Sequence, residues 1–171
     1  MNHFYQNIKG WFTYPKLYKE MVERFDDANF AEVGVYEGQS ISFLGVEVIN
    51  QNKNIKLHCI DNWNGVDIRL EQLKYNFHEN TYPIRHLLNT VDLPSTEAVQ
   101  EYPDEYFEFV FIDAAHDLVN VIRDIKAWYP KVKKGGVLAG HDYPNFAGVK
   151  KAVDLFFPNC KKDELCWIVQ K

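Results

Sequence analysis

Short apolar runs alternate along the chain with stretches in which apolar residues recur at helical spacing. Four strong runs and two weaker ones predict strands over Phe30–Val35, Ile55–Ile60, Phe107–Ile112 and Val137–Gly140, with Ile84–Leu88 and Leu165–Val169. The stretches between them predict helices over Pro15–Phe25, Ser40–Asn50, Asp67–Phe77, Leu118–Tyr129 and Val149–Phe156, with one more beginning at Ser95 as its N-cap. This alternation predicts an open, mostly parallel α/β sheet, in which ligands bind at the carboxyl ends of strands.

The first strong run breaks into a glycine loop before the next helix. Gly34 and Gly38 can adopt backbone angles that other residues disfavour, and Ser40 is placed to be the N-cap of the helix. Backbone N–H groups at such a turn suit an anionic ligand. The Gly-x-x-x-Gly spacing and the carboxylates of Glu32 and Glu37 argue against a pyrophosphate. S-adenosylmethionine fits better, because it offers a carboxylate to the N–H groups and an ammonium to Glu32; a turn without a ligand is the alternative.

A second polar group follows the next strand. Asp61 stands 23 residues beyond Gly38, where nucleoside-binding α/β sheets carry an acid that accepts the ribose hydroxyls. Its neighbours Asn62 and Trp63 are expected at the same site, with the indole of Trp63 against the adenine. An ordinary turn aspartate and a tryptophan packed in the core are the alternatives.

Acidic and imidazole side chains also follow the later strands. Asp113 and His116 come after the third strong run, and His141 and Asp142 come after the fourth. Charged groups in the middle of a sheet would lose their hydration without gaining partners. We therefore expect these residues to meet at one rim of the sheet and to form a site.

Two segments carry a family resemblance. Residues 109–116, FVFIDAAH, and 134–143, KGGVLAGHDY, resemble the signature of a small class I methyltransferase family related to catechol-type and macrocin-type sugar O-methyltransferases. The glycine loop resembles the first motif of these enzymes, with Tyr36 in place of the middle glycine. The likeness runs from Phe30 to Phe157, and it implies a single domain with a Rossmann-like, doubly wound α/β sheet of seven strands. The implied order is 3-2-1-4-5-7-6, with the seventh strand antiparallel.

The resemblance also divides the chain and assigns roles. Residues 1–28 would form an N-terminal aromatic segment with a leader helix, and residues 29–171 the S-adenosylmethionine-binding domain. The expected cofactor contacts are Glu32, Gly34, Tyr36, Gly38, Ser40, Asp61, Asn62, Trp63, Ser95 and Asp113. In metal-dependent relatives a divalent cation, Mg²⁺ or Mn²⁺, binds the substrate hydroxyl, which implies Asp113, His141 and Asp142 as its ligands. His116 would be the base, so the expected catalytic residues are His116, Asp113 and His141.

One position departs from the pattern of these relatives. His141 stands where an acidic ligand is common, and Mg²⁺ prefers oxygen to imidazole. His141 could therefore bind a softer cation, act as the base itself, or only form a hydrogen bond. For His116 the alternative is a helix-cap histidine, with Asp117 sharing the cap.

Charge and composition narrow the partners. The net charge of −5 argues against a nucleic-acid partner, which would need clustered Lys and Arg. Three cysteines without paired spacing indicate neither a disulfide framework nor a zinc site, which fits a reducing cytoplasm. The N-terminus lacks the apolar core of a signal peptide, and no apolar run approaches the roughly 20 residues that span a bilayer. We therefore expect a cytoplasmic protein with no membrane contact.

The first residues are unusually aromatic. This segment could cover the cofactor or substrate cleft, pack on the sheet, or form the interface of a homodimer. Its aromatic residues are Phe4, Tyr5, Trp11, Phe12 and Tyr14.

The leading hypothesis is an S-adenosylmethionine-dependent methyltransferase that acts on a hydroxyl of a small molecule or sugar. Residues 159–163 leave little room for a sixth strand, so residues that shape the acceptor pocket in relatives are expected to be missing. The sequence therefore leaves the acceptor open. A non-catalytic S-adenosylmethionine-binding module is one alternative, and a nicotinamide-dependent oxidoreductase is a less favoured one.

Overall fold

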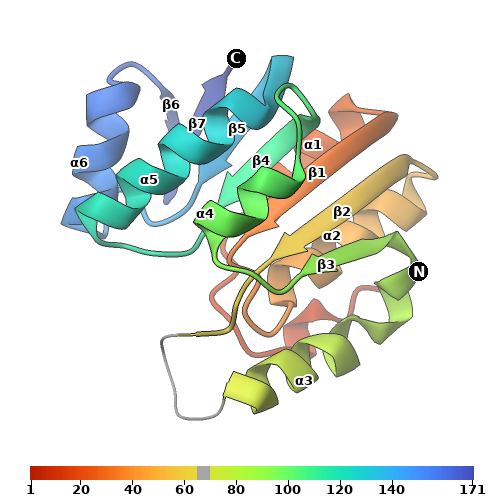
Figure 1. Ribbon diagram of the computed structural model, residues 1–171. Coiled ribbons are helices and arrows are strands. Elements are labelled where there is room, and N and C mark those ends of the chain that lie inside the picture. Colours follow the sequence, from red (N-terminus) through yellow and green to blue (C-terminus); the bar gives the residue numbers. More distant parts are fainter. Residues whose placement is uncertain (65–69) are drawn as a thin grey trace.

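The computed structural model describes residues 1–64 and 70–171, and a seven-stranded sheet runs through this part of the chain (Figure 1). The strands are β1 (Asp27–Val33), β2 (Asn54–Ile60), β3 (Leu88–Val91), β4 (Phe107–Ile112), β5 (Val132–Gly140), β6 (Lys161–Asp163) and β7 (Cys166–Gln170). The helices are α1 (Pro15–Arg24), α2 (Gln39–Asn50), α3 (Leu70–Thr81), α4 (Ser95–Ala98), α5 (Leu118–Trp128) and α6 (Ala147–Phe156). The strand order is β3-β2-β1-β4-β5-β7-β6, and β7 is antiparallel to both its neighbours, so the predicted fold is confirmed.

The register of the parallel strands aligns their carboxyl ends. Val33 at the end of β1 pairs with Ile60 of β2 and Ile112 of β4, and Ile112 pairs with Gly140 of β5. The residue that follows each of these four strands therefore begins a loop on the same rim of the sheet. These four residues are Gly34, Asp61, Asp113 and His141.

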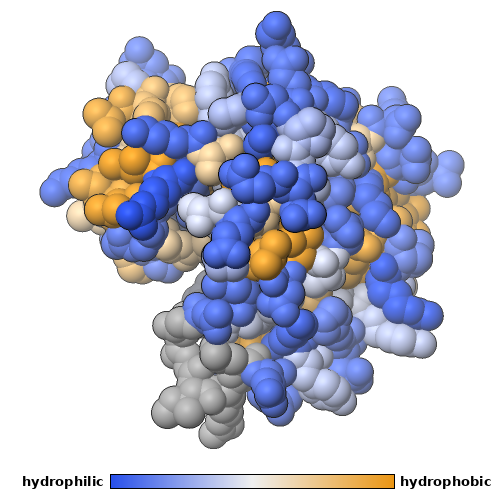
Figure 2. Space-filling model, in the orientation of Figure 1, coloured by the Kyte–Doolittle hydropathy of each residue, from blue (hydrophilic) through white to orange (hydrophobic). Residues whose placement is uncertain are grey.

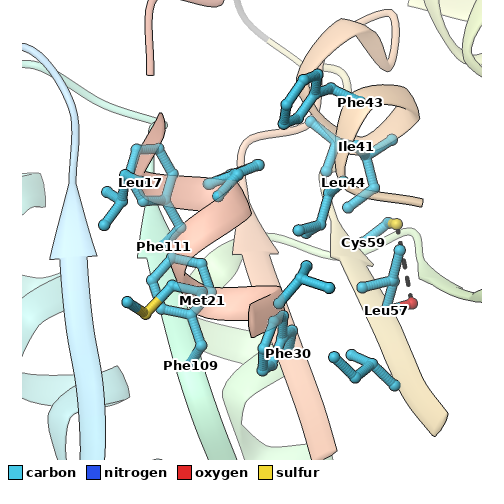
Figure 3. Close-up of a cluster of buried hydrophobic side chains, with 14 of the residues drawn as sticks. Leu17, Met21, Phe30, Ile41, Phe43, Leu44, Leu57, Cys59, Phe109 and Phe111 are labelled. Carbon is cyan, nitrogen blue, oxygen red and sulfur yellow. Dashed lines mark hydrogen bonds between the residues drawn. The ribbon is translucent and has the colours of Figure 1, made fainter. Parts of the chain in front are cut away.

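Helices cover both faces of the sheet. α1 and α2 pack on one face, and Figure 3 shows Leu17 and Met21 of α1 beside Phe109 and Phe111 of β4. α5 and α6 pack on the other face, where Trp128 is fully buried. Full burial of a large apolar side chain contributes roughly 1.5–3 kcal/mol. The two apolar layers thus stabilise the sheet and hold its rim in place.

Two predicted strands differ in detail. The third strand is Leu88–Val91 rather than Ile84–Leu88, because Ile84 is buried from a 3-10 turn over Tyr82–Leu87. The tail does contain a sixth strand, although β6 is only three residues long. The predicted helix start at Asp67 lies outside the described residues.

The face seen in Figure 2 is largely hydrophilic, with apolar residues gathered over α5 and α6. The large exposed apolar side chains of this region are Leu118, Val119, Phe146 and Leu155. None of the helices within residues 1–64 and 70–171 has the length and apolar character needed to cross a bilayer.

Candidate functional site

The loop between β1 and α2 is held in shape by the ends of the neighbouring strands. Oδ2 of Asp61, which follows β2, accepts hydrogen bonds from the backbone N–H groups of Val35 (3.0 Å) and Tyr36 (2.9 Å). Gly34 has φ +94°, and a Cβ there would lie 2.1 Å from the carbonyl oxygen of Asp113, after β4. Glycine is therefore required at this position by its backbone conformation and by its close approach to the next strand.

Asp61 lies at the rim as predicted, and its carboxylate supports the loop. Its Oδ1 also accepts a hydrogen bond from the backbone N–H of Trp63 at 2.7 Å. Burial raises the pKa of Asp61, although backbone hydrogen bonds from Tyr36 and Trp63 act in the opposite direction. A carboxylate has about four acceptor positions, and the backbone N–H groups of the two loops occupy most of those of Asp61. The ribose contact stays a prediction.

Glu32 is buried beneath the loop at 2% exposure. The hydroxyl of Ser40 donates to its Oε1, while Oε2 has no hydrogen-bond partner among the residues that the structure describes. Burial raises the pKa of Glu32 to about 8, against the opposing effects of the hydroxyl groups of Ser40 and Tyr18. An ammonium group would satisfy the unpaired oxygen and favour the ionised carboxylate, so this residue fits the predicted cofactor.

Two predicted helix caps are wrong. The N-cap of α2 is Gly38, with φ +87°, and Ser40 is instead the second residue of the helix. The N-cap of α4 is Pro94, and the hydroxyl of Ser95 donates to Asp124 of α5 at 2.5 Å. In both cases a buried carboxylate takes the hydroxyl that the sequence pattern assigned to the helix end. Whether Ser40 or Ser95 contacts the cofactor stays a prediction.

Trp63 packs beneath the loop rather than on the surface. Its ring is 4% exposed and lies 5.4 Å from the ring of Phe77, and its Nε1 donates to the carbonyl of Tyr36 at 2.8 Å. Next to it, the side-chain oxygen of Asn62 accepts from the backbone N–H of Asn64 at 3.0 Å. Trp63 is therefore packed in the core, which was the alternative to a role in binding the adenine. Contact between Trp63 and the adenine stays a prediction.

The polar residues after β4 and β5 form a second group on the rim. One ligand atom from each of Asp113, His141 and Asp142 lies within 4.8 Å of the others. Nδ1 of His141 is 3.7 Å from Oδ1 of Asp113 and 3.4 Å from Oδ1 of Asp142. Burial lowers the pKa of His141, but the two carboxylates outweigh burial and raise it. The structure thus brings together the three residues that the sequence predicts as metal ligands.

His116 belongs to the same group. Its Nε2 lies 2.6 Å from Oδ2 of Asp142, and its ring stacks on Phe146 with 4.2 Å between centroids. The hydrogen bond that His116 donates to Asp142 raises the pKa of His116. The N-cap of α5 is Asp117, whose carboxylate accepts from two N–H groups of the first turn. The helix-cap alternative therefore applies to Asp117 and not to His116.

Two residues of this group were not predicted. The hydroxyl of Tyr14 donates to Oδ2 of Asp113 at 2.9 Å, and Oγ1 of Thr13 lies 2.9 Å from Nε2 of His141. Both residues precede α1 and reach the rim from the N-terminal segment. The aromatic character of that segment indicated that it could cover the site, but it did not specify which residues Thr13 and Tyr14 would contact.

The sheet order with its antiparallel last strand, the glycine loop after β1 and the acid after β2 define a class I S-adenosylmethionine-dependent methyltransferase. A family model described as a methyltransferase domain matches residues 31–143, and the chain belongs to this family. The family resemblance read from the sequence and the prediction of a methyltransferase are thereby confirmed.

Similar proteins agree with this fold. The O-methyltransferase NovP superposes with a TM-score of 0.71 and 14% identity, over 92% of this chain and 78% of that chain. CalS11, a TDP-rhamnose 3'-O-methyltransferase of calicheamicin biosynthesis, gives a TM-score of 0.67 and 11% identity, over 91% of this chain and 76% of that chain. An uncharacterized protein of Acanthamoeba polyphaga mimivirus is 26% identical over 131 residues. That match covers 71% of this chain and 54% of the viral protein, so the chain spans about half the length of this curated relative.

Proposed function

We propose that this methyltransferase transfers the methyl group of S-adenosylmethionine to a hydroxyl of a small molecule or sugar, assisted by a divalent cation. The observation that carries the proposal is the position of the Asp113–His141–Asp142 cluster directly beside the glycine loop, since Gly34 packs against the carbonyl of Asp113. The two similar solved structures are named as O-methyltransferases, and one acts on TDP-rhamnose, which supports a hydroxyl acceptor.

In the cofactor half of the site, the chain offers complementary groups to an aminoacyl nucleoside. The start of α2 has no side-chain cap, so the first N–H groups of this helix are available to a carboxylate. The unpaired oxygen of Glu32 suits an ammonium, and Asp61 suits the ribose hydroxyls. S-adenosylmethionine supplies a methyl group on a sulfonium sulfur, which leaves as a neutral thioether.

In the acceptor half, His116 is the proposed base. Its side chain is 43% exposed, so an acceptor hydroxyl can reach it, and Asp142 at 2.6 Å stabilises the imidazolium that forms when the proton is taken. Asp113, His141 and Asp142 supply two carboxylates and an imidazole, a set that suits a divalent cation softer than Mg²⁺. A cation bound there lowers the pKa of a coordinated hydroxyl.

Calorimetric titration with S-adenosylmethionine tests the cofactor half. We expect the wild-type chain to bind, and Glu32→Ala and Asp61→Ala to bind at least about 10-fold more weakly, because each loses a charge-assisted contact. Asp104→Ala is the matched control, since Asp104 precedes β4 at the opposite end of the strand and pairs with Lys131 at the surface. Absence of binding by the wild-type chain would remove the proposal.

Methyl transfer to a panel of sugar and phenol hydroxyls tests the acceptor half. We expect product formation that a chelator abolishes and that Asp142→Ala lacks. Activity that survives both treatments would contradict the role of the cation. Cofactor binding without transfer to any acceptor would favour a non-catalytic module, and binding of NADH in a fluorescence titration would favour an oxidoreductase.

A further inference from the structure

The cluster of Asp113, His141 and Asp142 forms the acceptor half of the site, and each of its members has one polar atom that faces the other two and one that faces away. Nδ1 of His141 faces Oδ1 of Asp113 at 3.7 Å and Oδ1 of Asp142 at 3.4 Å. These three inner atoms converge on one point, as the ligand atoms of a cation centre do. The orientation of each ligand then depends on what holds its outer atom.

All three outer atoms have a partner, and two of the partners come from the N-terminal segment. Tyr14 donates its hydroxyl hydrogen to Oδ2 of Asp113, and Oγ1 of Thr13 contacts Nε2 of His141, both at 2.9 Å. The outer oxygen of the third member is held by His116. Every ligand is therefore oriented by a second residue from another part of the chain.

The N-terminal segment is itself fixed to the start of the cofactor helix. Nε2 of Gln39, the first residue of α2, donates to the carbonyl of Ile8 at 2.9 Å, and its Oε1 accepts from the N–H of Phe12 at 3.0 Å. The approach is close, because a Cβ at Gly10 would lie 2.6 Å from Oε1 of Gln39. The segment thus spans from the cofactor loop to the cluster with a defined path.

We propose, building on the function proposed above, that Thr13 and Tyr14 are positioning residues of the cation centre. Tyr14 turns the carboxylate of Asp113 so that Oδ1 faces the cation. Thr13 holds the ring of His141 through Nε2, and because its hydroxyl can accept from Nε2–H, this contact is compatible with an Nδ1 lone pair that faces a cation. Outer partners of this kind typically change metal affinity by about 10- to 100-fold.

A neighbouring tyrosine shows that packing alone does not explain the Tyr14 contact. The rings of Tyr14 and Tyr18 lie 5.0 Å apart in one aromatic cluster, and both are buried. The hydroxyl of Tyr18 is directed to Glu32, and within residues 1–64 and 70–171 it makes no hydrogen bond to Asp113, His141 or Asp142. Tyr18→Phe is therefore the matched control for Tyr14→Phe.

The test is titration of the full chain with Mn²⁺, followed by electron paramagnetic resonance of the free ion. We expect the wild-type chain to bind Mn²⁺, and Tyr14→Phe and Thr13→Val each to bind about 10-fold more weakly or worse. Thr13→Ser keeps the hydroxyl and should retain wild-type affinity, as should Tyr18→Phe. Thr13 is exposed, so its variants keep the test valid if Tyr14→Phe proves unstable.

A parallel titration with S-adenosylmethionine in the absence of metal separates this inference from the proposed function. Tyr14→Phe and Thr13→Val should bind the cofactor like the wild type, since their hydroxyls contact Asp113 and His141 rather than Glu32, Asp61 or the loop after β1. Equal Mn²⁺ affinity in the wild type and both variants would overturn the inference, as would a wild-type chain that binds no Mn²⁺. Failure of the wild type to bind the cofactor would count against the proposed function alone.

Discussion

The two halves of the rim are built in different ways. In the cofactor half, the carboxylate of Asp61 accepts hydrogen bonds from backbone N–H groups of the loop after β1. The two donors, Tyr36 and Val35, precede Asp61 by 25 and 26 residues. In the acceptor half, side chains hold other side chains, and the contacts of Tyr14 with Asp113 and of Thr13 with His141 join positions 99 and 128 residues apart. The first half is part of the backbone framework, whereas the second is assembled on it.

This difference predicts different responses to mutation. Changes in the cofactor half should alter the free energy of unfolding, because they disturb the backbone and the buried core. Changes in the acceptor half should reduce activity with little effect on unfolding, because side chains such as His116 and Asp142 lie at the partly exposed rim. Substitutions at Gly34, Glu32, Asp142 and Asp117 test this contrast.

Gly34→Ala should have the largest effect. The added methyl group meets the carbonyl of Asp113, and the alanine backbone must also adopt φ +94°. We therefore expect a loss of roughly 3–5 kcal/mol in the free energy of unfolding. Gly135→Ala is the control, because Gly135 has φ +80° but no described atom within 4 Å of the added group, and should cost only about 1 kcal/mol. Urea unfolding measures both, and equal losses would show that the contact with Asp113 does not matter.

Glu32→Gln should stabilise the protein without its cofactor in a pH-dependent way. Burial raises the pKa of Glu32 from 4.5 to about 8, so the folded protein keeps a proton that the unfolded chain releases in this range. The wild type therefore loses stability as pH rises from about 4.5 to about 8, and the glutamine variant does not.

We expect the variant to be more stable than the wild type by roughly 2–4 kcal/mol at pH 8 and about equally stable at pH 4. Urea unfolding at the two pH values measures the difference. The same variant should bind S-adenosylmethionine more weakly, because it loses the charge opposite the ammonium. A stability difference that does not change with pH would contradict this account of Glu32.

Asp142→Asn should separate activity from stability. It weakens the support of His116 and removes a carboxylate from the Asp113–His141–Asp142 cluster, so we expect activity to fall by about 10- to 100-fold. The free energy of unfolding should change by less than about 1 kcal/mol. Asp104→Asn, at the opposite end of β4, is the control and should leave activity unchanged. A large loss of stability in Asp142→Asn would erase the contrast between the two halves.

Asp117→Ala should have the smallest effect, although Asp117 is the sequence neighbour of His116. It removes the N-cap of α5 and should lower Tm by a few degrees, with activity unchanged. The hydrogen bonds from Asn120 hold the pKa of Asp117 below its usual range, so the capping contribution is present at neutral pH and is lost as pH falls through that pKa. Asp117→Ser, which restores a cap, should recover Tm; a fall in activity in either variant would extend the site to this residue.

The fold and the cofactor half follow largely from sequence because their determinants are local. Apolar runs specify strands, and the register of parallel strands brings the residues after each run to one rim. The misplaced third strand shows the limit of this argument, since Ile84 is buried from a turn rather than a strand. The caps at Ser40 and Ser95 failed for a related reason, because a buried carboxylate competed for each hydroxyl.

The outer contacts of the acceptor half could not be predicted in this way. The contacts of Thr13 and Tyr14 depend on the packing of α1 against the sheet, and no spacing in the sequence encodes them. The aromatic residues near them indicated a role for the segment without saying which groups it would touch. Side-chain contacts between distant segments are specified by packing, and packing is visible only in three dimensions.

The most direct test of the account is a crystal structure with S-adenosylhomocysteine bound. We expect the aminoacyl end at the start of α2, the ribose at Asp61 and the sulfur facing the cluster of Asp113, His141 and Asp142. A ligand bound elsewhere, or one whose sulfur points away from that cluster, would contradict this expectation.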